Sequence, residues 1–116
     1  MPRQYFDIGL TTDFMVAKPD PPVRADAVDA LRTALSGLRG LTEAYLVLCH
    51  VPGVSRAPAL VLILVLEPNT RAEAVMDLLG PRLGKIIPRN EFLDVWPLLA
   101  THPGLPSIRA ADCRIW

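Results

Sequence analysis

The sequence predicts an α+β fold, a two-layer sandwich built on an antiparallel, ferredoxin-like or ACT-like βαββαβ sheet with a C-terminal helix and short strand. One observation is residues 57–66, ten positions without a polar side chain, as in a strand covered on both faces. Another is the apolar segment 42–51, joined to it by turn-forming residues 52–56. The third is a pair of segments, 23–38 and 71–79, whose apolar residues recur every three or four positions, as in amphipathic helices.

Size and charge indicate a single domain spanning residues 1–116. The chain is 51% hydrophobic and 21% charged, and its 12 basic and 12 acidic residues cancel. This balance disfavours nucleic acid and an anionic membrane as partners. The run at 57–66 is well short of the roughly 20 residues that a membrane-spanning helix needs. We therefore expect a soluble protein.

The N-terminal part is expected to hold the first strand and the first helix. Tyr5–Leu10 alternates between apolar and polar residues and Phe14–Ala17 follows, so one or both pieces should form the first strand. The prolines that come next forbid its continuation. A single apolar stripe then predicts a helix over 23–38, with Gly37 and Gly40 as candidates for its left-handed end.

The two central strands, Thr42–Val51 and residues 57–66, are expected to pair as an antiparallel hairpin. Successive residues of a strand point to opposite faces of the sheet, and both faces of these strands are apolar. Helices of so short a chain cover one sheet face easily and the second with difficulty. The second face is therefore predicted to need a partner.

The second helix is expected to begin at a capping box. Thr70 and Glu73 have the spacing at which each side chain bonds the other's backbone N–H. The helix should end at Gly80-Pro81, because glycine favours a helix end and proline a stop. A short strand at Lys85–Ile87, closed by Pro88, should follow.

The C-terminal third poses a choice for the last helix. A helix capped at Asn90 would hold Pro97 in its interior, at a cost of ~3 kcal/mol. A start at Asp94 places Pro97 in the first turn, where its missing N–H costs little, so we predict a helix from Asp94 after extended residues 91–93. Beyond it we expect a loop at His102–Pro106 and a short edge strand at Asp112–Trp116.

No residue pattern predicts catalysis, a cofactor or a metal. Cys49 and His50 are neighbours in a predicted strand and should point to opposite faces, so they cannot act as nucleophile and base. With His102 and Cys113 they also lack the spacing of a zinc site. The glycine-containing run 80–85 does not have phosphate-loop spacing. Two distant cysteines and no signal-peptide core favour a reducing cytoplasm.

A set of packing and turn motifs runs from Phe14 to Trp116. Its members are Pro19–Pro22 before a helix, Ala44-Tyr45-Leu46 opening a strand, the apolar strand Leu60–Leu66, Ile87-Pro88, Leu93-Asp94-Val95 and the terminal Trp116. In these motifs the chain resembles the C-terminal domain of the bacterial SseB family, the enhanced serine sensitivity proteins. The resemblance implies no established reaction. Members of that family commonly carry an additional N-terminal domain.

Two functions remain open from the sequence. The first is a non-enzymatic protein-interaction module that uses the second sheet face for self-association or partner binding. Its predicted interaction residues are Tyr45, Val47, Val61, Ile63, Val65 and Trp116. The alternative is a small-molecule sensing domain, which would hold an amino acid at a helix–strand junction or a dimer seam.

The C-terminus ends in two large apolar residues, Ile115 and Trp116. Chain ends fray unless packing ties them down, and an exposed aromatic end invites association. We therefore predict that both side chains dock on the sheet.

Overall fold

The computed structural model describes residues 15–19, 22–50, 59–87 and 93–116. In these ranges the chain forms a four-stranded mixed sheet and three helices, which confirms the predicted α+β class. The elements in chain order are β1 (Met15–Ala17), α1 (Ala25–Leu35), β2 (Leu41–His50), β3 (Ala59–Leu66), α2 (Ala72–Ile86), β4 (Asp94–Leu99) and α3 (Leu105–Ala110). The candidate strand Tyr5–Leu10 and the turn at 52–56 lie outside the described residues.

The sheet is open, and its strands follow one another in space as β1-β2-β3-β4. β1 and β3 both run antiparallel to β2, so the predicted hairpin of β2 and β3 is confirmed. β4 runs parallel to β3, with Ile63 beside Trp96, because the chain returns through α2 before it enters β4. The described strands therefore do not have the antiparallel ferredoxin-like arrangement that the sequence predicted.

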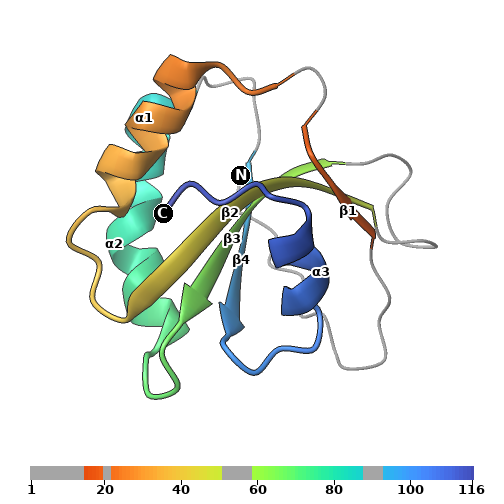
Figure 1. Ribbon diagram of the computed structural model, residues 1–116. Coiled ribbons are helices and arrows are strands. Elements are labelled where there is room, and N and C mark those ends of the chain that lie inside the picture. The colour runs from red at the N-terminus through yellow and green to blue at the C-terminus, as the bar shows by residue number, and fades with distance from the viewer. Residues whose placement is uncertain (1–14, 20–21, 51–58, 88–92) are drawn as a thin grey trace.

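Alternate residues of the strands face two separate apolar layers. Ala44 and Leu62 belong to the layer that contains Leu35 of α1 and Leu79 of α2. Tyr45 and the other set of strand residues belong to a second layer, which contains residues of α3. Figure 1 shows the same arrangement, with α1 and α2 beside one another and α3 apart from them across the sheet. Both sheet faces therefore pack against helices of the same chain.

The first helix is confirmed, although it is shorter than the predicted span 23–38. α1 ends at Leu35, and its buried residues Leu31, Ala34 and Leu35 are those of the predicted apolar stripe. Gly37 follows with a φ of 77°, in the left-handed region that glycine adopts without a steric cost.

The second helix differs from the prediction at both ends. α2 begins at Ala72 with no side-chain hydrogen bond at its cap, so the Thr70–Glu73 capping box is wrong. At its other end α2 runs through Gly80 and Pro81 to Ile86, which removes the predicted strand at Lys85–Ile87. Leu79 and Leu83, on either side of Pro81, are completely buried, and this packing offsets the hydrogen bond that the proline cannot make.

The segment from Asp94 is a strand, and the predicted helix there is wrong. Pro97 lies within β4, which among the described strands pairs with β3 alone. A residue without an N–H is tolerated in such a strand because its other side needs no ladder hydrogen bond. Val95 belongs to the α1–α2 layer, and Trp96 and Leu98 belong to the α3 layer. The predicted loop at His102–Pro106 is in part helical, since α3 begins at Leu105.

Candidate functional site

The sheet face predicted as an interaction surface is buried inside the chain. The exposed fraction is 3% or less for five of the six predicted residues, Tyr45, Val47, Val61, Ile63 and Val65. The reason is α3, whose Leu105 and Ile108 pack in the same layer and are 1% and 0% exposed. These five residues are therefore not available to a partner of the folded chain, and this prediction is corrected.

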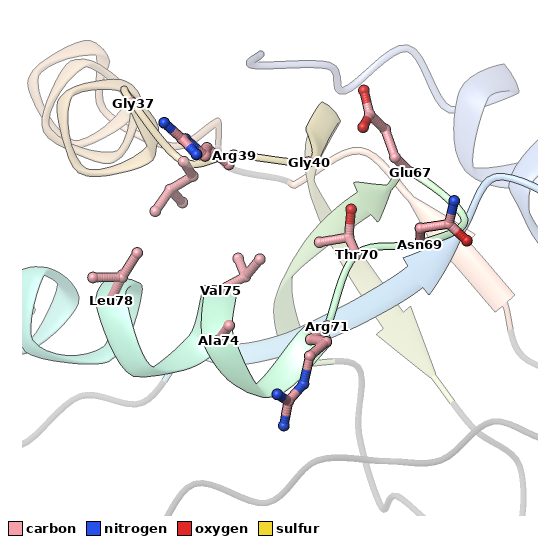
Figure 2. A pocket seen from close by; sticks show the side chains of 11 residues that line it. Gly37, Arg39, Gly40, Glu67, Asn69, Thr70, Arg71, Ala74, Val75 and Leu78 are labelled. Atoms are coloured by element: carbon pink, nitrogen blue, oxygen red, sulfur yellow. The ribbon is translucent and has the colours of Figure 1, made fainter.

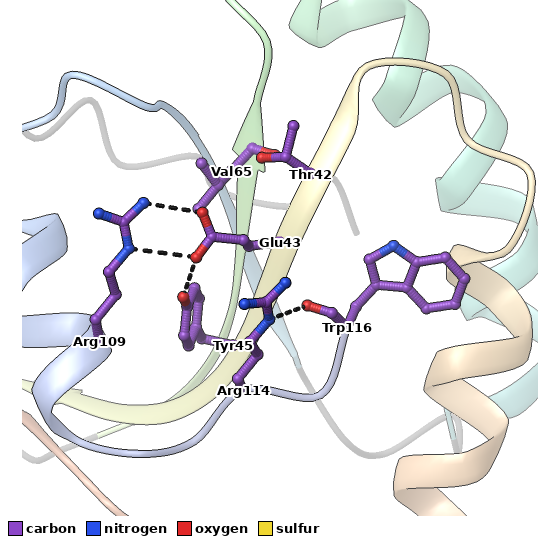
Figure 3. A network of polar contacts seen from close by, with 7 residues as sticks. All are labelled: Thr42, Glu43, Tyr45, Val65, Arg109, Arg114 and Trp116. Atoms are coloured by element: carbon purple, nitrogen blue, oxygen red, sulfur yellow. Dashed lines mark hydrogen bonds and ion pairs between the residues drawn. The ribbon is translucent and has the colours of Figure 1, made fainter.

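The helix α3 is tied to β2 through one carboxylate, Glu43 (Figure 3). Arg109 of α3 donates from Nε to Glu43 Oε1 at 3.2 Å and from Nη2 to Oε2 at 2.8 Å. The Tyr45 hydroxyl donates to the same Glu43 Oε1. Arg109 first, and Tyr45 second, lower the pKa of the Glu43 carboxyl. A carboxylate held ionised in this way is a poor general acid. The role of these contacts is to hold α3 against the sheet.

The C-terminal residues lie along β2 next to the segment that β1 occupies. Arg114 forms a single antiparallel bridge with Tyr45, and Ile115 N donates to Ala44 O at 2.8 Å. The Ile115 side chain packs partly buried against the α1–α2 layer, whereas Trp116 is 39% exposed. Docking of the C-terminal backbone and of Ile115 is therefore confirmed, and burial of the Trp116 ring is not found.

The two thiols do not form a reactive centre. Burial, with a smaller contribution from Asp94, raises the pKa of the Cys49 thiol to about 12. Burial also raises the pKa of Cys113, whose Sγ donates to Ala111 O at 3.2 Å. Both groups are thus protonated at neutral pH, and the thiolate is the nucleophile and the metal ligand. Within the described ranges, His, Cys, Asp and Glu form no group of three or more that could hold a metal ion.

A groove with a volume of about 560 Å³ lies between the turn after α1 and the start of α2 (Figure 2). Residues 37–40 form one wall, and Glu67 and residues 69–71 with Ala74, Val75 and Leu78 form the other. Figure 2 shows Val75 and Leu78 pointing from α2 toward this turn, while the side chain of Arg71 points away from it. The inner surface of the groove is therefore mainly apolar.

Contacts at two places hold the groove walls together. At the strand end, Glu67 N donates to Gly40 O at 2.8 Å. Gly40 has a φ of 84°, and a Cβ there would lie 2.1 Å from Thr70 Oγ1, so the two walls approach too closely for any other residue. Nearer the helices, Arg82 of α2 donates from Nη1 to Ala34 O at 3.0 Å and to the carbonyl of Ser36 at 2.9 Å. The groove is thus preformed by the fold.

The outer face of α2 next to the groove carries an exposed apolar stripe. Ala74, Leu78 and Pro81 are spaced by four and three positions, share one side of the helix and are all exposed. Leu78 is 55% exposed, the most of the large exposed apolar side chains in the described part of the chain. We call the groove and this stripe together the α2 surface.

The sequence carried a partial signal for this surface. The spacing of Ala74, Leu78 and Pro81 is visible in the sequence, but ending the helix at Gly80-Pro81 removed Pro81 from the stripe. The groove had no sequence signal of its own, because its walls meet through contacts of Gly40 with Glu67 and Thr70, which are distant in the sequence.

Comparisons with known proteins leave the family open. Neither family models, curated proteins nor solved structures yield a match to this chain. Across the described residues, no helix has the length and apolar character needed to cross a membrane.

Proposed function

We propose that this chain is a non-enzymatic protein-interaction module that contacts its partner through the α2 surface. The observation that carries the proposal is Leu78, a large apolar side chain that is 55% exposed at the border of a preformed apolar groove. Burial of such a side chain in a partner contributes about 1.5–3 kcal/mol, and a neighbouring groove can accept a side chain in return.

The state of the ionisable groups supports a non-enzymatic role. Cys49 has a pKa of about 12, which makes it unreactive near neutral pH. Glu43 is held ionised by Arg109 and Tyr45, a state that suits a structural contact better than proton transfer. Our further proposal that the module is of the SseB C-terminal type, and that it works in the bacterial cytoplasm, is supported by the sequence motifs.

A small-molecule sensing domain is the second candidate, and the groove volume favours it. Sites for small molecules commonly measure about 300–1,000 Å³, and the groove has about 560 Å³. An amino acid would also need charged groups for its ammonium and carboxylate. Arg39 and Glu67 also line the groove, whereas the side chain of Arg71 points away from it. The rest of the lining is mainly apolar and Leu78 is exposed at its border, so the protein-interaction proposal is the better supported.

Affinity capture with matched variants tests the proposal. The bait would be the full chain as wild type, as Leu78→Asp, and as Leu99→Asp, a control in which an equally apolar and 47% exposed leucine outside the α2 surface gains the same charge. Proteins retained by wild type are identified, purified and measured again by calorimetry. The proposal expects a purified protein that binds wild type and the Leu99 variant and loses at least about tenfold in affinity with Leu78→Asp.

The same preparations separate the two candidate functions. Thermal denaturation is measured with each amino acid at millimolar concentration, because a ligand at 100 times its Kd stabilises by about 2.7 kcal/mol. A specific rise in Tm that Leu78→Asp abolishes would favour sensing. Purified partners that bind the Leu78 variant as tightly as wild type would contradict the interaction proposal.

A further inference from the structure

Within α2 itself the exposed charged residues are separated by sign, and the exposed Arg71 precedes the helix. Glu73 and Asp77 lie in its N-terminal half, and Lys85 lies in its last turn. Among the described residues none of these three forms an ion pair, and all three are exposed. Glu73 and Lys85 are about 18 Å apart along the helix axis, with the apolar stripe of Ala74, Leu78 and Pro81 between them.

We infer that the partner of the α2 surface is a second copy of this chain, bound through an antiparallel contact between the two α2 helices. The inference rests on the proposed function and names the partner of the same surface. In a two-fold symmetric contact the same patch of each copy meets that of the other. Such a patch must therefore contain both partners of every pair of residues that interact across the contact. The exposed side of α2 does contain both, because Glu73, Asp77 and Lys85 lie next to the α2 surface on the same helix.

The charge order fixes the orientation of the two helices. In an antiparallel pair, the acidic N-terminal half of each α2 lies beside Lys85 of the other copy. In a parallel pair, Glu73 and Asp77 would face the same acidic residues, which is unfavourable. The zero formal net charge of the chain adds no general repulsion between two copies.

The apolar part of the surface is self-complementary in the same way. Leu78 protrudes beside the groove, so each copy can offer a protruding side chain and an apolar recess at the same place. The exposed Ala74 and Pro81 allow close approach, because one side chain is small and the other is compact. A symmetric contact therefore removes the Leu78 side chains of both copies from water together.

The size of the surface predicts a weak dimer. One helix face of 15 residues with an adjoining groove is smaller than the roughly 800 Å² per partner of a standard interface. We expect a Kd on the order of 10–100 µM, with association that weakens as salt is added.

Sedimentation velocity of the full chain from about 1 to 500 µM tests the inference. Wild type and the Leu99→Asp control should shift from monomer to dimer over this range, and Leu78→Asp should weaken dimerisation at least about tenfold. Lys85→Glu and the double variant Glu73→Lys/Asp77→Lys should each dimerise more weakly than wild type, because like charges then meet. Circular dichroism and Tm establish that every variant is folded.

The decisive measurement is the mixture of the two charge variants. In an antiparallel heterodimer of Lys85→Glu with Glu73→Lys/Asp77→Lys, opposite charges meet at both ends. The equimolar mixture should therefore dimerise more strongly than either variant alone. A wild type that stays monomeric at 500 µM, or a mixture no stronger than its components, would overturn the inference. A Leu78-dependent complex with another purified protein in that case would leave the proposed function standing.

Discussion

Glu43 of β2 and Arg109 of α3 are 66 residues apart in the chain and form a two-point ion pair with N–O distances of 2.8 and 3.2 Å. The Glu43 side chain is 17% exposed and that of Arg109 is 46% exposed, so water reaches the contact mainly from the arginine side. The pair fastens the helix that covers the second sheet face. Its strength should therefore decide how firmly that face stays closed.

Replacing this carboxylate tests the role of the pair. The pKa of Glu43 is lowered in the folded chain, so its ionised form stabilises the fold above its ordinary pKa, and that stability is lost as pH falls through the folded value. Glu43→Gln should lower the urea midpoint at pH 7, and the difference from wild type should shrink at pH 3. Asp29→Asn, which breaks an exposed pair with Arg32, is the control and should change the midpoint little at either pH. Equal midpoints for Glu43→Gln and wild type at pH 7 would contradict this role.

Truncating the buried side of α3 should open the same sheet face. Ile108 is 0% exposed, and Ile108→Ala should cost about 2–5 kcal/mol in the free energy of unfolding. Ser107→Ala, on the exposed side of the same helix, should change it by less than about 0.5 kcal/mol. Chemical denaturation measures both values. A similar loss for the two variants would show that α3 does not pack as described.

Two glycines in the turn after α1 separate backbone strain from steric contact. Gly37 and Gly40 both have positive φ, but a Cβ on Gly37 meets nothing within 4 Å, whereas on Gly40 it lies 2.1 Å from Thr70 Oγ1. Gly37→Ala should cost about 1–2 kcal/mol from strain, and Gly40→Ala should cost more. Adding Thr70→Ala to Gly40→Ala should recover part of the difference. Equal unfolding free energies for the two single variants would contradict the close approach at Gly40.

The C-terminal residues are expected to contribute through Ile115 more than through Trp116. Ile115 is partly buried, and Ile115→Ala should cost about 1–2 kcal/mol, below the range for fully buried positions. Trp116 is 39% exposed, and Trp116→Ala should cost less than about 1 kcal/mol. Denaturation midpoints of the two variants provide the test. A larger loss for Trp116→Ala would mean that its ring carries the docking.

Periodicity in the sequence was sufficient for the central elements. The apolar stripe of α1 and the apolar runs of β2 and β3 are strong local patterns, and the structure confirms all three elements and the antiparallel pairing of the strands. Sequence patterns were insufficient at two prolines, whose structural roles were inferred from the neighbouring residues alone. Pro81 predicted a helix end and Pro97 a helix start, yet buried Leu79 and Leu83 carry α2 past Pro81, and pairing with β3 holds Pro97 in a strand.

The candidate site was harder to predict because covering a sheet face is a tertiary property. The five sheet residues were identified correctly as apolar, but six residues of α3, with only Leu105 and Ile108 facing inward, are enough to bury them. The α2 surface was missed for a related reason. Its exposed stripe depends on how far the helix continues, and its groove depends on the contact of Gly40 with a segment distant in the sequence.

The division of the β2 edge between β1 and the C-terminal residues has a consequence for aggregation. β1 pairs with residues 48–50, and the C-terminal residues bond to the backbone of Ala44 and Leu46. An uncovered strand edge is a template for the strand of another molecule. If residues 113–116 are lifted or removed, the newly bared edge belongs to an apolar strand at the centre of the domain. Such a chain should form β-rich aggregates at temperatures where most of its molecules are still folded.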